Sequence, residues 1–276
     1  MKKKSVKDYM IIYIILFFLF LVQVIPIAQV FLNSFRSDNE VKTMPFGLPK
    51  AWTLNNWPET WKMGGYGIAF INSLITASVV IVIVLFIVGI GAYALSKLQF
   101  RLRGFFTAYF FVAISLPGFL YIVPDYFLFS RIGLINTRFA LIIIYTASSL
   151  PFNMLLLRTF LGSIPRELEE AAKIDGCTEF GVFFRITVPI AKTIFLTIAI
   201  LVFVSCWNEF LWANTFITDE MLKPVSTRYV KFVGQYSSNM ARIYTASAIT
   251  ILPIIAMYVL FSRRFIEGMT SGSVKG

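Results

Sequence analysis

The sequence predicts an all-α integral membrane protein with six transmembrane helices and both termini in the cytoplasm. Hydrophobic residues make up 58% of the 276 residues and charged residues only 14%, against roughly 25% in soluble domains. Six apolar segments are each long enough to cross a hydrocarbon core of ~30 Å. Transmembrane barrels would need short alternating strands, which the sequence lacks. The predicted spans are residues 9–35, 68–96, 105–130, 139–160, 193–217 and 243–262.

Two of these segments need a choice between alternatives. The first could pass for a secretory signal, but its apolar core is too long and no small-residue cleavage site precedes Pro26 and Gln29. It is therefore predicted to be a retained span. Residues 78–95 are rich in β-branched side chains that favour strands in water, yet the unbroken length favours a membrane helix. The prolines expected to kink or break spans are Pro26, Pro117, Pro124, Pro151 and Pro253.

The distribution of Lys and Arg predicts the orientation of these spans. With the N-terminus inside, fifteen of the 25 Lys and Arg residues fall on the inner side, and the short inner loops carry the densest clusters. That bias is the pattern of the positive-inside rule. The five tryptophans then lie on the outer side or at outer ends of spans, where indole rings anchor at the interface.

The chain is predicted to divide at the Pro- and Gly-containing outer loop 36–67. Residues 1–67 hold the N-terminal tail, the first span and this loop. Residues 68–264 form a core domain of five helices with a long inner loop at 163–189, and residues 265–276 form a cytoplasmic tail. No internal repeat is evident.

Several classes of chemistry are excluded by composition and motif. Histidine is absent, which removes the commonest general base and metal ligand. Cys177 and Cys206 match no metal spacing, and no phosphate-binding G-x-x-x-x-G-K-[ST] loop occurs. The chain is therefore predicted to be no enzyme by itself, with no catalytic residue, bound cofactor or metal. Its net charge of +11 is ascribed to membrane orientation and not to nucleic acid.

The inner loop between the fourth and fifth spans predicts two short helices. Pro165 suits a first helical turn, Gly176 suits a left-handed C-terminal position, and Thr178 can cap the second helix. Leu168, Ala171 and Ala172 are spaced i, i+3 and i+4 and so share a face. Docking to a cytoplasmic partner is favoured over lying on the inner leaflet, because the acidic first turn would be repelled by a negative membrane surface.

This loop resembles the signature of binding-protein-dependent ABC importer permeases, the EAA motif. The motif runs EAA, three residues, Gly, nine residues, Ile, one residue, Leu and Pro, and Val188 replaces its usual leucine. The resemblance implies that the loop couples the chain to an ATPase. The residues that match the motif are Glu170, Ala171, Ala172, Gly176, Ile186 and Pro189, and Leu168 is added as a coupling residue because it shares a helix face with Ala171 and Ala172.

Other segments, among them 70–77, 92–104, 133–160, 207–213 and 265–276, are similar to the carbohydrate-importer branch of that family, and above all to its maltose-type permease. The resemblance implies a type I ABC importer transmembrane domain in the inner membrane of a prokaryote. It further implies a homologous second permease, two cytoplasmic ATPase subunits that hold ATP and Mg²⁺, an extracytoplasmic solute-binding protein and a sugar substrate.

Polar residues inside the spans are the candidates for the translocation pathway, because they are costly in lipid. They are Asn72, Asn153, Asn208 and Glu209. Each has an alternative role in an interhelical hydrogen bond. Amide and carboxylate acceptors beside aromatic rings suit sugars, and Glu209 is flanked by Trp207 and Trp212.

A stand-alone secondary transporter or channel is the alternative function. Such proteins often carry internal repeats and buried ionisable residues for ion coupling. Neither feature is evident in this sequence, and the loop 163–189 would then have no purpose.

The predicted topology can be tested with reporter fusions. Fusions near Trp57 and Tyr236 should report an extracytoplasmic location, and fusions near Gly104 and Gly176 a cytoplasmic one, because of the charge bias. A cytoplasmic signal at Trp57 would overturn the whole assignment.

Overall fold

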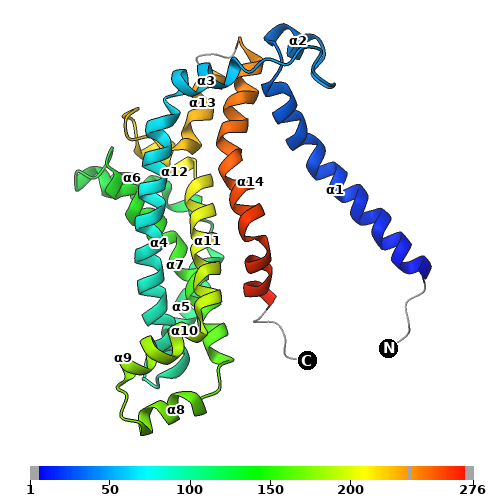
Figure 1. Ribbon diagram of the computed structural model, residues 1–276. Helices are drawn as coiled ribbons and strands as arrows, with labels where there is room; N and C mark the ends of the chain where they lie inside the picture. Colours follow the sequence, from blue (N-terminus) through cyan, green and yellow to red (C-terminus); the bar gives the residue numbers. More distant parts are fainter. Residues whose placement is uncertain (1–5, 235–237, 271–276) are drawn as a thin grey trace. The chain divides into compact units, whose positions relative to one another are not determined.

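The computed structural model describes residues 6–234 and 238–270, and all regular elements in these ranges are helices (Figure 1). Side chains are described for residues 9–234 and 238–262. The predicted end of the tail at 271–276, the basic residues Lys2–Lys4 and the fusion point Tyr236 lie outside the described residues.

The helices fall into two compact units. The first unit runs up to Gly67 and includes Arg228–Pro253, and the second comprises Ile68–Thr227 and the chain from Ile254 onward. The predicted domain boundaries stay predictions. The first unit contains α1 (Val6–Ser34), α2 (Asp38–Thr43), α3 (Asn56–Gly64), α13 (Arg228–Gly234) and the first part of α14 (Met240–Thr270). The second contains most of α4 (Tyr66–Lys97), with α5 (Arg103–Ser115), η1 (Gly118–Tyr121), α6 (Ile122–Arg131), α7 (Arg138–Gly162), α8 (Glu167–Ile174), α9 (Glu179–Val182), η2 (Phe183–Thr187), α10 (Val188–Ile190), α11 (Lys192–Asn208), α12 (Leu211–Phe216) and η3 (Val225–Thr227).

Four described helices are long and apolar enough to cross a membrane unaided: Tyr9–Ser34, Tyr66–Lys97, Arg138–Gly162 and Met240–Ser262. Six spans result only if each of two bent helix pairs counts as one span. The chain is thus an all-α, multi-pass membrane protein, and the exact count of six stays a prediction.

The third predicted span, 105–130, is not one continuous helix. Helix α5 ends at Ser115, Leu116 is extended, and the following segment Gly118–Arg131 is bent by 91° from α5. Pro117 explains the break, because it lacks an N–H donor and disfavours a helical conformation at the residue before it. Pro26, Pro151 and Pro253 are by contrast accommodated inside helices.

The fifth predicted span, 193–217, is also interrupted. Helix α11 ends at Asn208, Glu209 is extended, and α12 begins at Leu211. At its other end, α11 is bent by 77° from the helical segment Glu179–Ile190. The predicted span is therefore not one continuous helix, and a separate short helix follows from Leu211.

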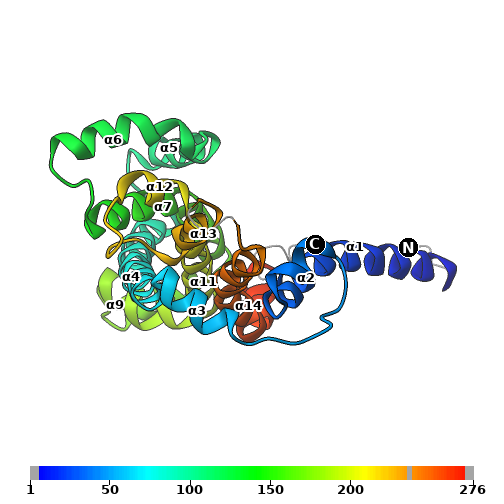
Figure 2. The same cartoon turned by 90° about the horizontal axis from the view of Figure 1, so that it is seen from above.

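The core of the second unit forms where α4, α7 and α11 come together. Val80, Val84 and Val88 recur at every fourth position of α4 and are fully buried, as one face of a helix requires. Figure 2 shows α5 and α6 on one side of α7 and α12 within this unit, and α5 and α11 both pack on α7. A Cβ on Gly91 would stand 2.7 Å from Cε of Met154, so glycine permits close packing of α4 on α7.

The first unit is organised around a buried cation. Arg36 is fully buried and donates to Asn33 Oδ1 at 2.8 Å and to Glu40 Oε1 at 3.1 Å. The Lys50 N–H donates to the same carboxylate, and this bond, together with Arg36, lowers the pKa of Glu40. Thr245 of α14 donates to the Ser34 carbonyl at the end of α1. These bonds tie the loop after the first span to α1 and α14.

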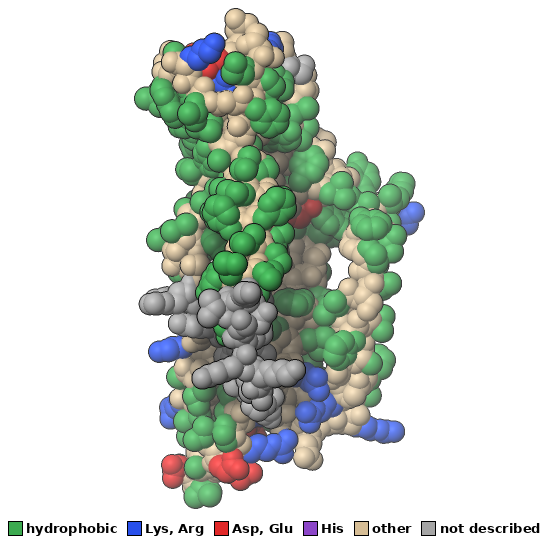
Figure 3. All heavy atoms as spheres, turned by 90° about the vertical axis from the view of Figure 1, so that its right-hand side faces the viewer, with side chains coloured by type: hydrophobic (Ala, Val, Ile, Leu, Met, Phe, Trp, Pro, Cys, Tyr) green, Lys and Arg blue, Asp and Glu red, His purple; other side chains and the backbone are tan. Residues whose placement is uncertain are grey.

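The surface shows where the molecule meets an apolar solvent. In Figure 3 most side chains on the visible face are hydrophobic, and Lys and Arg gather mainly at the end where Figure 1 places α8. Exposed apolar side chains with charge confined to helix ends are the pattern that a bilayer imposes.

Candidate functional site

The loop 163–189 has the local structure that its sequence predicts, with one shift. Gly176 has φ +84°, and the Thr178 side chain accepts from the Gly181 N–H as the cap of α9. Pro165 does not lie in the first turn of α8, because Arg166 is the N-cap and the helix begins at Glu167. The two short helices α8 and α9 therefore meet at a left-handed glycine turn.

The exposed face of α8 differs from the predicted one. Leu168 and Ala171 are exposed, but Ala172 is buried against the chain's own core, next to Glu169. The i, i+3, i+4 spacing put all three predicted residues on one stripe, and it did not reveal which edge of that stripe faces inward. The most exposed apolar side chain is Ile174, at 86%. Sequence reasoning missed Ile174, although an isoleucine before a predicted glycine turn was a usable signal.

The other predicted coupling residues occupy both sides of the loop. Glu170, Gly176 and Pro189 are exposed, whereas Ile186 is half-buried and packs on the core. Phe180 and Phe184 add exposed rings beside the turn. The loop thus presents small and apolar side chains outward while one edge is anchored.

The anchor of α8 is a buried ion pair with the end of α4. Lys97 Nζ lies 2.9 Å from Glu169 Oε1, and the two side chains are 3% and 7% exposed. The same ammonium donates to the Ile164 carbonyl at 2.8 Å. The geometry to Glu169 is that of a charge pair and not of a well-aligned hydrogen bond. Removing one partner of such a pair leaves an uncompensated buried charge, which costs about 3–5 kcal/mol.

A second polar link joins α4 to α9. Tyr93, one turn before Lys97, donates its hydroxyl to Glu179 Oε2 at 3.0 Å. Glu179 also pairs with Lys173 at the end of α8. Both short helices of the loop are thus held by side chains from the last turns of one long helix.

The side-chain amide of the first pathway candidate, Asn72, is hydrogen-bonded to other groups of the same chain. It is 1% exposed, and its amide donates to the carbonyls of Met221 and Lys223 at 2.8 and 3.2 Å. Its Oδ1 accepts from Arg138 at 2.7 Å. These contacts favour the structural alternative, in which Asn72 fixes the loop after α12 to α4.

The other two asparagines differ from each other. Asn153 is 4% exposed and donates to the Ser149 carbonyl one turn earlier, while its buried Oδ1 has no hydrogen-bond partner among the described residues. Asn208 is exposed at the end of α11. Their roles in a pathway stay predictions.

Glu209 accepts hydrogen bonds from the first turn of the helix that follows it. Its carboxylate accepts from the N–H groups of Trp212 at 2.9 Å and Ala213 at 3.1 Å, and from the Tyr145 hydroxyl at 2.8 Å. A carboxylate at a helix N-terminus satisfies donors that the helix leaves free. Glu209 therefore links the break between α11 and α12 to α7.

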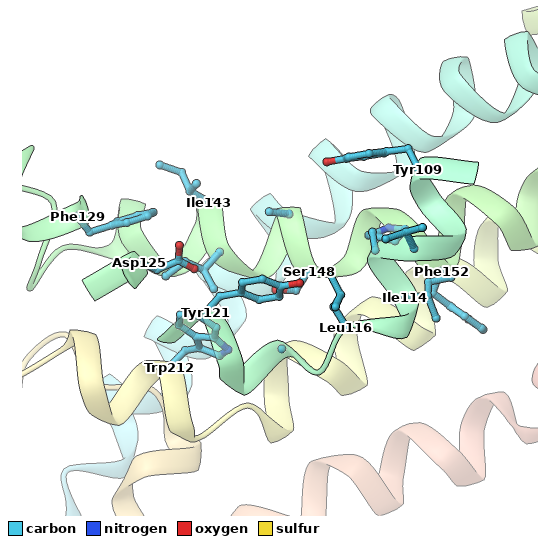
Figure 4. A pocket seen from close by; sticks show the side chains of 16 residues that line it. Tyr109, Ile114, Leu116, Tyr121, Asp125, Phe129, Ile143, Ser148, Phe152 and Trp212 are labelled. Carbon is cyan, nitrogen blue, oxygen red and sulfur yellow. The ribbon is translucent and has the colours of Figure 1, made fainter. Parts of the chain in front are cut away.

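A cavity of about 630 Å³ opens beside the broken third span, between α5, η1, α6, α7 and α12 (Figure 4). We call it the aromatic cavity. Figure 4 shows Asp125, Tyr121 and Trp212 towards one end and Tyr109 and Phe152 towards the other. Its volume lies within the range of roughly 300–1,000 Å³ that ligand pockets occupy. None of the four predicted pathway residues lines it.

Asp125 is the only acid among the residues that line the aromatic cavity, and no Lys or Arg joins it there. No hydrogen bond or ion pair to its carboxylate occurs among the residues that the structure describes. An unpartnered acid within a membrane segment is costly and points to a water-filled or ligand-binding site. Sequence reasoning missed Asp125, although it is the only acid besides Glu209 in the six predicted spans.

Residues 86–269 match the family model of the binding-protein-dependent transport system inner membrane component. The probable ABC transporter permease protein YurM of Bacillus subtilis is 35% identical over 94% of this chain and 86% of its own length. The diacetylchitobiose uptake system permease protein NgcG of Streptomyces coelicolor is 30% identical over 91% of this chain and 84% of its own length.

The fold also matches a solved structure. A chain from the crystal structure of a bacterial ABC transporter involved in the import of the acidic polysaccharide alginate superposes with a TM-score of 0.80. The match covers 96% of this chain and 100% of that one, at 24% sequence identity.

The contacts of Glu209 generate a stability prediction. Glu209→Gln replaces one acceptor oxygen by a donor, so at least one of the three bonds is lost, at about 1–3 kcal/mol. The purified protein should unfold at a lower temperature, and less of it should accumulate in the membrane. Asn208→Ala, at the exposed neighbouring residue, is the control and should unfold like the wild type. Unchanged stability with altered uptake in Glu209→Gln would instead assign Glu209 to the pathway.

Proposed function

This chain belongs to the family of binding-protein-dependent transport system inner membrane components. We propose that it imports a neutral oligosaccharide. It is a permease subunit, not an enzyme. ABC importers of this kind work with an ATPase and a binding protein. In our proposal the complete machine contains this chain, a homologous second permease, two cytoplasmic ATPase subunits that bind ATP and Mg²⁺, and an extracytoplasmic binding protein. Its location is the inner membrane of a prokaryote.

The loop 163–189 is proposed to dock on the ATPase at the cytoplasmic side. Support comes from its exposed face, where Leu168, Ala171 and Ile174 present apolar or small side chains on an anchored helix. Isolated exposed side chains are ordinary, but here they form one stripe that ends at the sharp turn of Gly176. A groove in a partner would bury this stripe, and Glu170 would lie at its polar edge.

The aromatic cavity is proposed to contact the sugar during passage, and it is the observation that carries the substrate class. Rings such as Tyr121 and Trp212 offer flat apolar faces, and the free carboxylate of Asp125 can accept hydrogen bonds from sugar hydroxyls. A carboxylate in a low-dielectric site also repels anions. The cavity therefore suits neutral sugars better than uronic acids.

The docking proposal predicts the effect of two substitutions. Ile174→Asp should leave the fold intact, because the side chain is 86% exposed, yet it should abolish ATPase association by placing a charge in the interface. Gly176→Val should also abolish ATPase association, because it strains the turn between α8 and α9. A β-carbon in the left-handed region costs roughly 1–2 kcal/mol. Co-purification with the ATPase and solute-stimulated ATP hydrolysis measure the outcome.

Glu170→Gln is the matched comparison for these variants and should weaken association less. Ala172→Trp is a poorer probe, because Ala172 is buried and the larger ring would disturb the chain's own core. Wild-type association and uptake in both Ile174→Asp and Gly176→Val would refute the docking assignment.

The cavity proposal predicts a change of selectivity in Asp125→Asn. Binding of labelled diacetylchitobiose, raffinose and maltotriose is measured on the purified importer without its binding protein, with alginate oligomers as anionic competitors. Loss of hydrogen bonds to a charged acceptor, worth about 1.5–3 kcal/mol, should weaken neutral-sugar binding tenfold or more, and the anionic competitors should begin to bind.

Glu220→Gln removes an equal charge outside the cavity and should behave like the wild type. If the wild-type importer binds none of the neutral sugars, the sugar assignment fails. If it binds them and Asp125→Asn binds both classes as the wild type does, the cavity does not select the substrate.

A further inference from the structure

A second concave site lies at the end of α4 that carries Lys97. This basic pocket has a volume of about 320 Å³. Four cations line it: Lys97 from α4, Arg103 from α5, Arg158 from α7 and Arg166 before α8. The hydroxyl-bearing residues Ser96 and Thr159 lie among them, and no acid lines the pocket.

The charges in the basic pocket are only partly compensated by the protein. Lys97 is paired with Glu169. Arg103 donates to the Ser96 carbonyl at 3.2 Å, and Arg158 donates to the Leu95 carbonyl at 3.4 Å. No other hydrogen bond or ion pair to either guanidinium occurs in the described part of the chain. Both side chains belong to half-buried residues, where free N–H donors facing a shared cavity favour an anion.

Positive charge at the ends of spans is common and needs no ligand by itself. The orientation of spans in a membrane, however, does not require cations from different helices to lie close together. Here cations from three separate helices and one loop line the same pocket. Guanidinium groups match phosphate oxygens in bidentate geometry. The ligand chemistry that fits is therefore a phosphate group.

The surroundings of Arg103 indicate where that phosphate comes from. Leu102 is 54% exposed and Phe105 is 64% exposed, and Phe100 and Phe106 add further exposed rings. An apolar flank of this kind suits acyl chains, whereas a soluble phosphate would gain nothing from it. Basic pockets between transmembrane helices also bind anionic lipid headgroups in other membrane proteins.

We propose that the basic pocket binds the phosphate headgroup of an anionic phospholipid, with Arg103 and Arg158 as the main ligands and the acyl chains along Phe105. The site is separate from the aromatic cavity and shares no lining residue with it. It does not depend on which sugar the chain carries.

The test uses the full importer in nanodiscs that contain phosphatidylcholine with phosphatidylglycerol, and native mass spectrometry counts the lipids retained. The wild type should retain phosphatidylglycerol over phosphatidylcholine, and Arg103→Gln with Arg158→Gln should retain it roughly tenfold less. Arg131→Gln with Lys192→Gln removes two charges from exposed residues outside the pocket and outside the loop 163–189 and is the matched control. Lysine at both pocket positions should restore part of the retention, which separates lost charge from lost folding.

Inorganic phosphate separates the two sources of the same chemistry. At millimolar concentration it should leave phosphatidylglycerol bound, because it lacks the acyl chains. Complete displacement by phosphate would make the pocket a soluble-anion site and overturn the lipid assignment. Equal retention in the glutamine double variant and the wild type would overturn the site itself.

Discussion

The buried ion pair between Lys97 and Glu169 fixes the loop 163–189 to the helical core of the second unit. Breaking a charge pair whose side chains are 3% and 7% exposed costs much free energy. The pair therefore holds α8 to the last turn of α4. Tyr93 adds the link to Glu179 in α9. Because α4 is one continuous helix from Tyr66 to Lys97, a displacement of the loop would be carried along its length. We therefore expect the proposed docking surface and the core of the second unit to move together.

The two interrupted spans create the aromatic cavity. Unbroken helices packed side by side leave little polar surface and little space. Pro117 lies where the chain bends by 91° after α5, and Glu209 lies in the break between α11 and α12. These interruptions open the aromatic cavity and direct Asp125 and Trp212 towards it. Irregular backbone at membrane depth is tolerated where it lines such a cavity.

Sequence patterns predicted the helical class, the Gly176 turn and the Thr178 cap, because hydropathy, glycine and capping residues act locally. They did not predict which edge of α8 faces inward. That edge is set by the ion pair of Glu169 with Lys97, a residue more than seventy positions earlier in the chain, and Ala172 is buried beside it. Asn136 is a similar case. It has φ +63° and accepts from the N–H groups of Thr218 and Asp219, a pairing invisible before the chain folds. Asp125 was missed because helical periodicity cannot reveal an open side created by a bend.

If the Lys97–Glu169 pair transmits movement of the loop 163–189 to α4, breaking the pair should weaken the coupling of transport to ATP hydrolysis. In the reconstituted importer, sugar uptake per ATP hydrolysed is compared among the wild type, Lys97→Met, and Lys97→Met combined with Glu169→Met. Lys97→Met should lower the free energy of unfolding by about 3–5 kcal/mol, and the double variant should regain stability but transport less sugar per ATP. Wild-type uptake per ATP in the double variant would show that the pair does not transmit this movement.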